Sequence, residues 1–154
     1  MKIIKLLLLC SVLILIFSCK DNNNTTVEVF YKNKTPSLKT LEKVNITLED
    51  FKDIYLITYY EITDTESMEI IQRYNLPDTH FPFAVLINGK YSIEIKSKKI
   101  DFVHFPIFMH GIGRHEGNWS LEDMRVALEN PHLLLEENTL PILEEDENET
   151  ECYD

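Results

Sequence analysis

A short run near the middle of the chain constrains the fold more than any other stretch. Residues 83–87 (FAVLI) are uninterrupted apolar sequence, Asn88-Gly89 follows at once, and residues 91–96 again have the composition of a strand. Asn-Gly between two such runs predicts a β-hairpin, because both residues tolerate the positive φ of a type I′ turn. Pro82 has no N–H for a sheet ladder, so it fits the first position of its strand.

The first residues have the pattern of an export signal. Lys2 and Lys5 precede an apolar run, residues 6–17, that is too short to span a bilayer as a finished helix. The run ends in Phe17-Ser18-Cys19 after an isoleucine, and this resembles the bacterial lipobox, in which the cysteine thiol is acylated and the signal is cut before it. We therefore expect a lipoprotein signal over residues 1–18, lipid on Cys19, and a polar tether over residues 19–26. An ordinary secretory signal or an uncleaved anchor is the alternative.

Net charge and cysteine content limit the kinds of partner and the disulfides that the mature chain could have. Cleavage before Cys19 removes two of the 15 basic residues and none of the 26 acidic ones, which leaves a formal charge of −13. This argues against binding to nucleic acid or to an anionic membrane through net charge, so lipid on Cys19 would supply the membrane contact. Cys10 leaves with the signal and only Cys152 remains, which excludes a disulfide within the mature domain. The expected location is the bacterial cell envelope, facing the periplasm or the surface.

Patterns along the rest of the chain predict alternating strands and helices. Val27–Tyr31 favours a strand, and residues 54–62 are apolar on both alternations, which is typical of a central strand covered on both faces. A helix is expected from Thr35, with a break near Asn45 if a second, shorter helix begins there. Its buried stripe should comprise Leu38, Leu41, Val44, Leu48 and Phe51.

Two more helices follow from cap residues and apolar spacing. Asp64 to Ser67 can cap a short helix over residues 68–74, with Ile70, Ile71 and Tyr74 on its inner face. Ser120 with Asp123 predicts the last helix, which Asn130-Pro131 ends. Residues 133–135 and 140–143 could pack as a short extra segment. Residues 144–154 are almost purely acidic and are expected to be a disordered tail.

The predicted order is β-α-β-α-β-β-α, an α/β sheet with helices on both faces, over a domain of residues 27–143. The run from Tyr74 to Phe81-Pro82 (YNLPDTHFP), followed by apolar residues and Asn88-Gly89, resembles the second half of a thioredoxin domain. In that family a tyrosine ends a helix, a cis-proline opens the next strand and an Asn-Gly-type turn follows. The resemblance covers residues 27–128 and implies a thioredoxin-like fold with a long insertion before the last helix.

The residues that would carry redox chemistry in that family are different here. Thr35-Pro36-Ser37-Leu38 occupies the place of Cys-x-x-Cys, after the first strand. A Thr or Ser hydroxyl is too weak an acid to replace a thiolate without a nearby base, and none is visible locally. Thr35 and Ser37 are more simply read as helix caps. Dithiol catalysis is therefore not expected, and no cofactor is predicted.

The resemblance does imply a binding surface. In the family the backbone of the residue before the cis-proline pairs with an extended peptide, so Phe81 and Pro82 would do so here, beside Thr35, Pro36 and Ser37. The alternative is that Pro82 is only a strand-entry residue. A peptide, a protein or a small ligand is thus the expected partner, besides the membrane.

The long stretch of residues 100–119 permits two further interpretations. Phe105 and Trp119 could form the aromatic wall of a ligand groove, or they could pack onto the domain and extend its core. His104, His110 and His115, with Glu116 in the same stretch and His80 before it, suggest a metal site, although their spacing matches no compact motif. Three hypotheses stay open: a redox-inactive binding module, a metal-binding protein or enzyme built on this loop, and a structural envelope lipoprotein.

Overall fold

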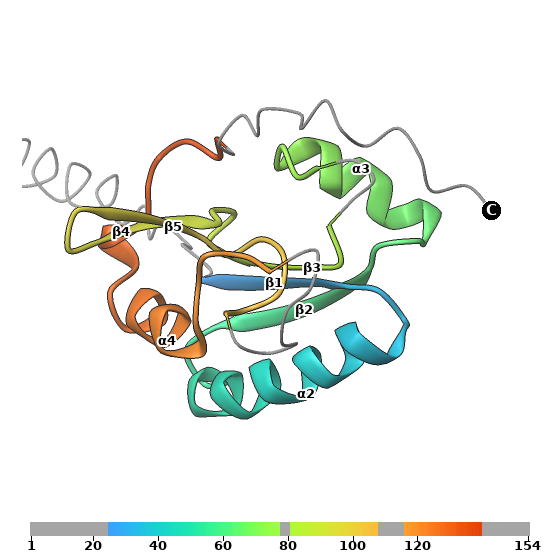
Figure 1. The fold of residues 1–154 in the computed structure, drawn as a ribbon, viewed down its shortest axis with the longest axis horizontal. Coiled ribbons are helices and arrows are strands. Elements are labelled where there is room, and N and C mark those ends of the chain that lie inside the picture. Colours follow the sequence, from blue (N-terminus) through green and yellow to red (C-terminus); the bar gives the residue numbers. More distant parts are fainter. Residues whose placement is uncertain (1–24, 78–80, 108–115, 140–154) are drawn as a thin grey trace, which may run out of the picture.

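The computed structural model describes residues 25–77, 81–107 and 116–139 (Figure 1). In chain order the elements are β1 (Thr26–Tyr31), α2 (Thr35–Leu48), the 3-10 helix η1 (Glu49–Phe51), β2 (Leu56–Glu61), α3 (Thr65–Arg73), β3 (Phe83–Ile87), β4 (Ser92–Ile95), β5 (Lys98–Asp101), α4 (Leu121–Glu129) and η2 (Pro131–Leu133). The predicted α/β class is confirmed. Within the described residues, no helix has the length and apolar content needed to cross a bilayer.

Strand β1 is the centre of a three-stranded sheet in the order β2-β1-β3. It runs parallel to β2, with Val27 opposite Ile57, and antiparallel to β3, with Val27 opposite Ile87. Helix α3 covers one face of this sheet, and α2 and α4 lie on the other (Figure 1). Helices therefore cover both faces, as the alternating pattern predicts.

The position predicted for β2 was wrong. Among the described residues β2 pairs only with β1, so it is an edge strand and not a central one. Ile54, Leu56 and Tyr59 are 61%, 62% and 44% exposed. Its apolar sequence resembles that of a doubly covered strand, and no local signal distinguishes the two situations.

The Asn-Gly turn forms as predicted and a second strand, β4, follows it, but this strand does not pair with β3. Asn88 and Gly89 both have positive φ, 53° and 74°. Asn88 N–H donates to Thr26 C=O at 2.8 Å, and Asn88 Oδ1 accepts from Thr26 N–H at 3.0 Å. After Tyr91 the chain leaves β3, and β4 pairs instead with β5 across a turn at Lys96 and Ser97. Phe102, directly after β5, lies next to β3 again, and its C=O accepts a hydrogen bond from Val85 N–H at 2.9 Å.

Helix α2 is continuous through Asn45, and its buried face differs from the prediction. The buried positions are Ser37, Thr40, Val44, Thr47 and Leu48, whereas Leu38 is 41% exposed. Small hydroxyl residues can occupy this face because their oxygens are bonded; Thr40 Oγ1, for instance, donates to Pro36 C=O at 3.2 Å. Helix α2 therefore lies close to the sheet.

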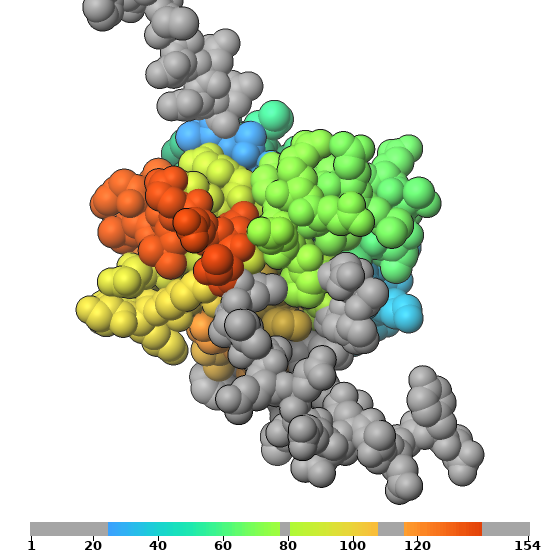
Figure 2. Space-filling model, turned by 90° about the horizontal axis from the view of Figure 1, so that it is seen from above, coloured from blue at the N-terminus to red at the C-terminus, as the bar shows by residue number. Residues whose placement is uncertain are grey.

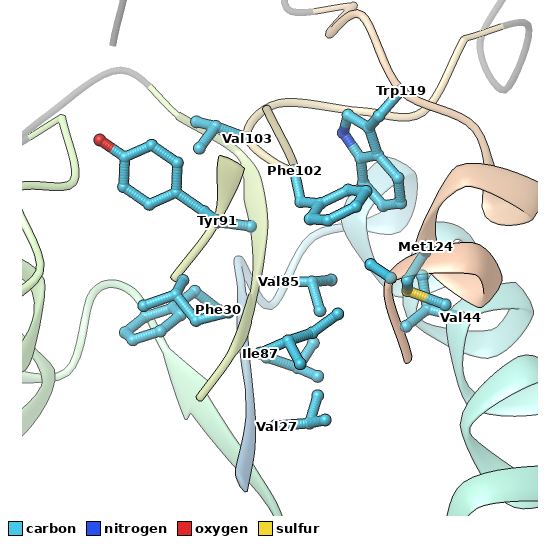
Figure 3. Close-up of a cluster of buried hydrophobic side chains, with 14 of the residues drawn as sticks. Val27, Phe30, Val44, Val85, Ile87, Tyr91, Phe102, Val103, Trp119 and Met124 are labelled. Atoms are coloured by element: carbon cyan, nitrogen blue, oxygen red, sulfur yellow. The ribbon is translucent and has the colours of Figure 1, made fainter. Parts of the chain in front are cut away.

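The main core lies between the sheet and helices α2 and α4 (Figure 3). Figure 3 shows Val27, Val85 and Ile87 of the sheet facing Val44 of α2 and Met124 of α4, all five fully buried. Ser120 and Asp123 form the predicted capping box at the start of α4. Helix α3 begins at Thr65, earlier than predicted, and buries Ile71 as expected.

The last described residues run along the small sheet. Leu134 is buried and bridges to Ile93 of β4, and Leu135 N–H donates to Ser92 C=O at 2.9 Å. In Figure 2 this segment, in red, lies against the yellow β4–β5 hairpin. We call residues 134–139 the C-terminal strap.

Candidate functional site

The end of β1, the start of α2 and the start of β3 meet at one buried hydroxyl. Ser37 Oγ accepts a hydrogen bond from Lys32 N–H at 2.9 Å and donates one to Pro82 C=O at 3.0 Å. The side chain is 1% exposed. Because the N-cap residue, Lys34, makes no side-chain cap, Ser37 is the residue that fixes this helix start to the sheet. The expected helix-cap role of Ser37 and Thr35 is therefore replaced by a bond between elements.

Pro82 enters β3 with a trans peptide bond. No cis peptide occurs among the described residues, which include Phe81 and Pro82, so the cis-proline implied by the resemblance is contradicted. Pro82 is buried and Phe81 is 1% exposed. The carbonyl of Pro82 is already occupied by Ser37, so this end of β3 offers less to an extended peptide than the resemblance implies.

The predicted contact residues divide into a buried and an exposed group. Ser37 and Pro82 are brought together, and Thr35 and Pro36 are exposed beside them at the first turn of α2. Leu38 adds a large apolar side chain to this exposed turn. The accessible part of the candidate site is thus Thr35, Pro36 and Leu38. The buried hydrogen bond between Ser37 and Pro82 fixes this turn to β3.

Phe105 and Trp119 belong to the core and not to a groove wall. They are 7% and 0% exposed, and Trp119 packs edge-on against Phe102 with ring centroids 5.6 Å apart. Trp119 Nε1 donates to His104 C=O at 3.2 Å. Gly117 lets the two chain segments approach, because a Cβ there would lie 2.4 Å from Val103 O. The interpretation as an extension of the core is confirmed for these two aromatics.

The metal hypothesis falls mostly outside the described residues. His80, His110 and His115 lie there, as do Cys19 and Cys152. His104 is described, is half-buried, and has a φ of 68°. In residues 25–77, 81–107 and 116–139, no three His, Cys, Asp or Glu side chains are grouped so that they could hold a metal ion.

Sequence reasoning missed a buried acid in the central strand. Glu28 of β1 is 9% exposed, and its Oε1 accepts a hydrogen bond from Tyr74 Oη at 3.1 Å. Burial raises the pKa of the Glu28 carboxyl above its usual value, against smaller opposing effects of the hydrogen bonds from Tyr74 and Thr26. Its Oε2 has no partner among the described atoms. The signal was present, since Glu28 stands between Val27 and Val29 in a strand with helices on both faces.

A second set of buried polar groups lies within the β4–β5 sheet. Asp101 Oδ1 accepts from Ser92 Oγ and lies 3.2 Å from Lys99 Nζ, and Asp101 N–H donates to Asn118 Oδ1 at 2.9 Å. Burial, and then the charge of Asp101, raise the pKa of Tyr91 to about 12. Ser92 and Asp101 are both buried, and their side chains satisfy each other across β4 and β5.

Comparison with known proteins identifies no relative. The chain matches no family model, and no curated protein and no solved structure matches it. The contacts of Ser37 and Pro82 and the exposure of the first turn of α2 are therefore the basis for a functional proposal.

Proposed function

We propose that this chain is an exported, lipid-anchored domain of thioredoxin-like descent that has lost dithiol chemistry and acts by binding a peptide or small ligand. The lipobox at Cys19 supports the anchor, and the order β-α-β-α-β before the small sheet supports the descent. The trans bond before Pro82 and the separate β4–β5 sheet are departures from the family pattern.

One observation carries the binding proposal. Ser37, which lies between the two positions that correspond to the cysteines of Cys-x-x-Cys, Thr35 and Leu38, is hydrogen-bonded to Lys32 N–H and to Pro82 C=O. Its hydroxyl therefore joins two backbone groups, and among the described residues no basic side chain is bonded to it that would make it a nucleophile. The turn above it presents Thr35, Pro36 and Leu38 to solvent in a fixed position. A rigid turn with an exposed leucine is suited to recognition, because little conformational entropy is lost on contact.

A peptide-display selection tests the binding proposal. A random-peptide library is selected on the mature protein, and selected peptides are titrated against the wild type, Leu38→Asp and Met68→Asp. Met68 is a matched control, since it is 55% exposed on α3. We expect Leu38→Asp to weaken binding at least tenfold and Met68→Asp to leave it unchanged. Peptides that bind all three proteins equally, or a selection that yields none, would contradict the proposal.

The anchor has a separate test. Mass spectrometry of the N-terminal peptide, from the full chain produced in a bacterium, should show an acylated Cys19 as the first residue. Cys19→Ser should abolish both the cleavage and the added mass. An N-terminus cut elsewhere without lipid would indicate an ordinary secretory signal.

A further inference from the structure

Thr25, the first described residue, lies beside two exposed apolar residues at the start of the edge strand β2. Thr25 Oγ1 donates to Ile54 C=O at 2.6 Å, and Leu56 N–H donates to Thr25 C=O at 2.9 Å. Ile54 and Leu56 are 61% and 62% exposed. Thr25, near the end of the tether, is thus hydrogen-bonded to both residues of this pair.

The length of the tether limits how far this end can be from the membrane. Six residues lead from Cys19 to Thr25, and a fully extended chain of that length spans at most about 20 Å. A lipid on Cys19 would therefore hold Thr25, and with it Ile54 and Leu56, close to the bilayer surface. Natural edge strands are usually protected by charge, proline or a covering segment, whereas β2 begins with the exposed Leu56 and is preceded by the exposed Ile54.

We propose that Ile54 and Leu56 rest in the lipid–water interface of the membrane that holds Cys19, so that the domain is oriented and not merely tethered. This rests on the proposed lipid anchor. Transfer of the two side chains out of water supplies the attraction. Asp53 is exposed nearby, but Asp50 is paired with Arg125 and Lys52 lies between the two acids. The formal charge of −13 of the mature chain is what favours a zwitterionic over an anionic surface.

The orientation has a consequence for the candidate site. Strand β1 runs from Thr26 at the tether end to Tyr31 at the other end, where Phe83 lies opposite it. Ser37 and Pro82 are therefore at the end of the sheet away from Thr25. Docking through Ile54 and Leu56 turns the exposed turn of α2 toward the aqueous side, where a soluble ligand can reach it.

The test places a fluorescent probe either at the tether end of β2 or on α3. The full chain carrying Cys152→Ser and either Leu56→Cys or Met68→Cys is produced in a bacterium, labelled with a nitrobenzoxadiazole dye and reconstituted in phosphatidylcholine vesicles. The lipid blocks the Cys19 thiol, so only the new cysteine is labelled. Met68 is the control, because α3 follows the far end of β2 and Met68 is similarly exposed.

We expect the dye at position 56 to shift to shorter wavelength and to lose at least half of its emission when nitroxide-labelled lipids are present. The dye at position 68 should change little, and adding Ile54→Asp should reduce the quenching at position 56. Vesicles that contain phosphatidylglycerol should give weaker quenching than phosphatidylcholine alone.

Three results would overturn the proposal. Equal quenching at both positions, or none, with an acylated Cys19 refutes the docking and leaves the anchor intact. Shielding at position 56 that rises with the ratio of protein to lipid assigns the surface to a second copy of the chain. An N-terminus without lipid refutes the anchor and the docking together.

Discussion

At the scale of single residues, Glu28 is a buried acid whose carboxyl pKa is raised by its surroundings. It lies in the central strand under Tyr74, and burial is the largest influence on its pKa, which is raised. Burial also raises the pKa of the Tyr74 hydroxyl, and the adjacent Glu28 raises it further. The neutral form of Glu28 is therefore the one that this site favours, because an ionised carboxylate with an unbonded oxygen is costly to bury.

The variant Glu28→Gln should remove a pH-dependent loss of stability. Because the pKa of Glu28 is higher in the folded than in the unfolded chain, the folded state binds more protons, and stability falls as pH rises from about 4.5 through the raised pKa. Glutamine keeps the shape without ionising. Urea unfolding at pH 4, 5, 6 and 7 should show a stability gap in favour of the variant that widens with pH.

Glu94→Gln is the matched control for this measurement, since Glu94 is exposed on β4. Its stability should follow that of the wild type across the same pH range. A constant gap between the Glu28→Gln variant and the wild type would show that Glu28 does not hold its proton in the folded state.

At the scale of elements, the helix starts were only partly predictable. The capping box of α4 is a local pattern, and the sequence identifies Ser120 and Asp123 correctly. The start of α2 has hydroxyls at Thr35 and Ser37 as well, but Ser37 bonds to Pro82, 45 residues away. Local spacing cannot distinguish a cap from such a long-range bond, which is also why Leu38 and not Ser37 was expected in the core.

Ser37→Ala should therefore destabilise the domain, whereas Thr35→Ala should not. Removing Ser37 Oγ leaves Lys32 N–H and the buried Pro82 C=O without this partner, at a cost of about 1–3 kcal/mol. Thr35 is exposed and its side chain forms no cap, so its loss should change the free energy of unfolding by less than about 0.5 kcal/mol. Chemical denaturation of both variants measures the difference. Equal stability of the two would mean that the Ser37 bond contributes nothing measurable.

At the scale of the whole molecule, the sequence predicts the order of elements better than their pairing. Apolar periodicity and turn residues are local, so the strands, the helices and the Asn88-Gly89 turn were foreseeable. Pairing depends on the complete fold: β2 is at the edge although it has the composition of a central strand, and β4 pairs with β5. The role of the C-terminal strap depends on contacts across 49 residues, between Asn138 and Gly89.

The C-terminal strap binds the Asn88-Gly89 turn through the side chain of Asn138. Asn138 Nδ2 donates to Gly89 C=O at 2.7 Å, and Asn138 Oδ1 accepts from Tyr91 N–H at 3.2 Å, so the side chain binds the backbone on both sides of Lys90. Lys90 Nζ and Glu136 add an ion pair at 2.8 Å. The Asn88-Gly89 turn that defines β3 is thus held by the last described residues of the chain.

Asn138→Ala should lower the free energy of unfolding by about 1–3 kcal/mol, because the Tyr91 N–H and the Gly89 C=O each lose a partner. Thr139→Ala is the control: Thr139 is exposed, and its contact with Lys99 uses the backbone carbonyl, which the substitution keeps. Amide hydrogen exchange should locate the effect, with faster exchange at Tyr91 and Leu135 in the Asn138→Ala variant only. If exchange at Tyr91 stayed at the wild-type rate, the turn would be held without the strap, by the bonds between Asn88 and Thr26 and between Ile87 and Lys90.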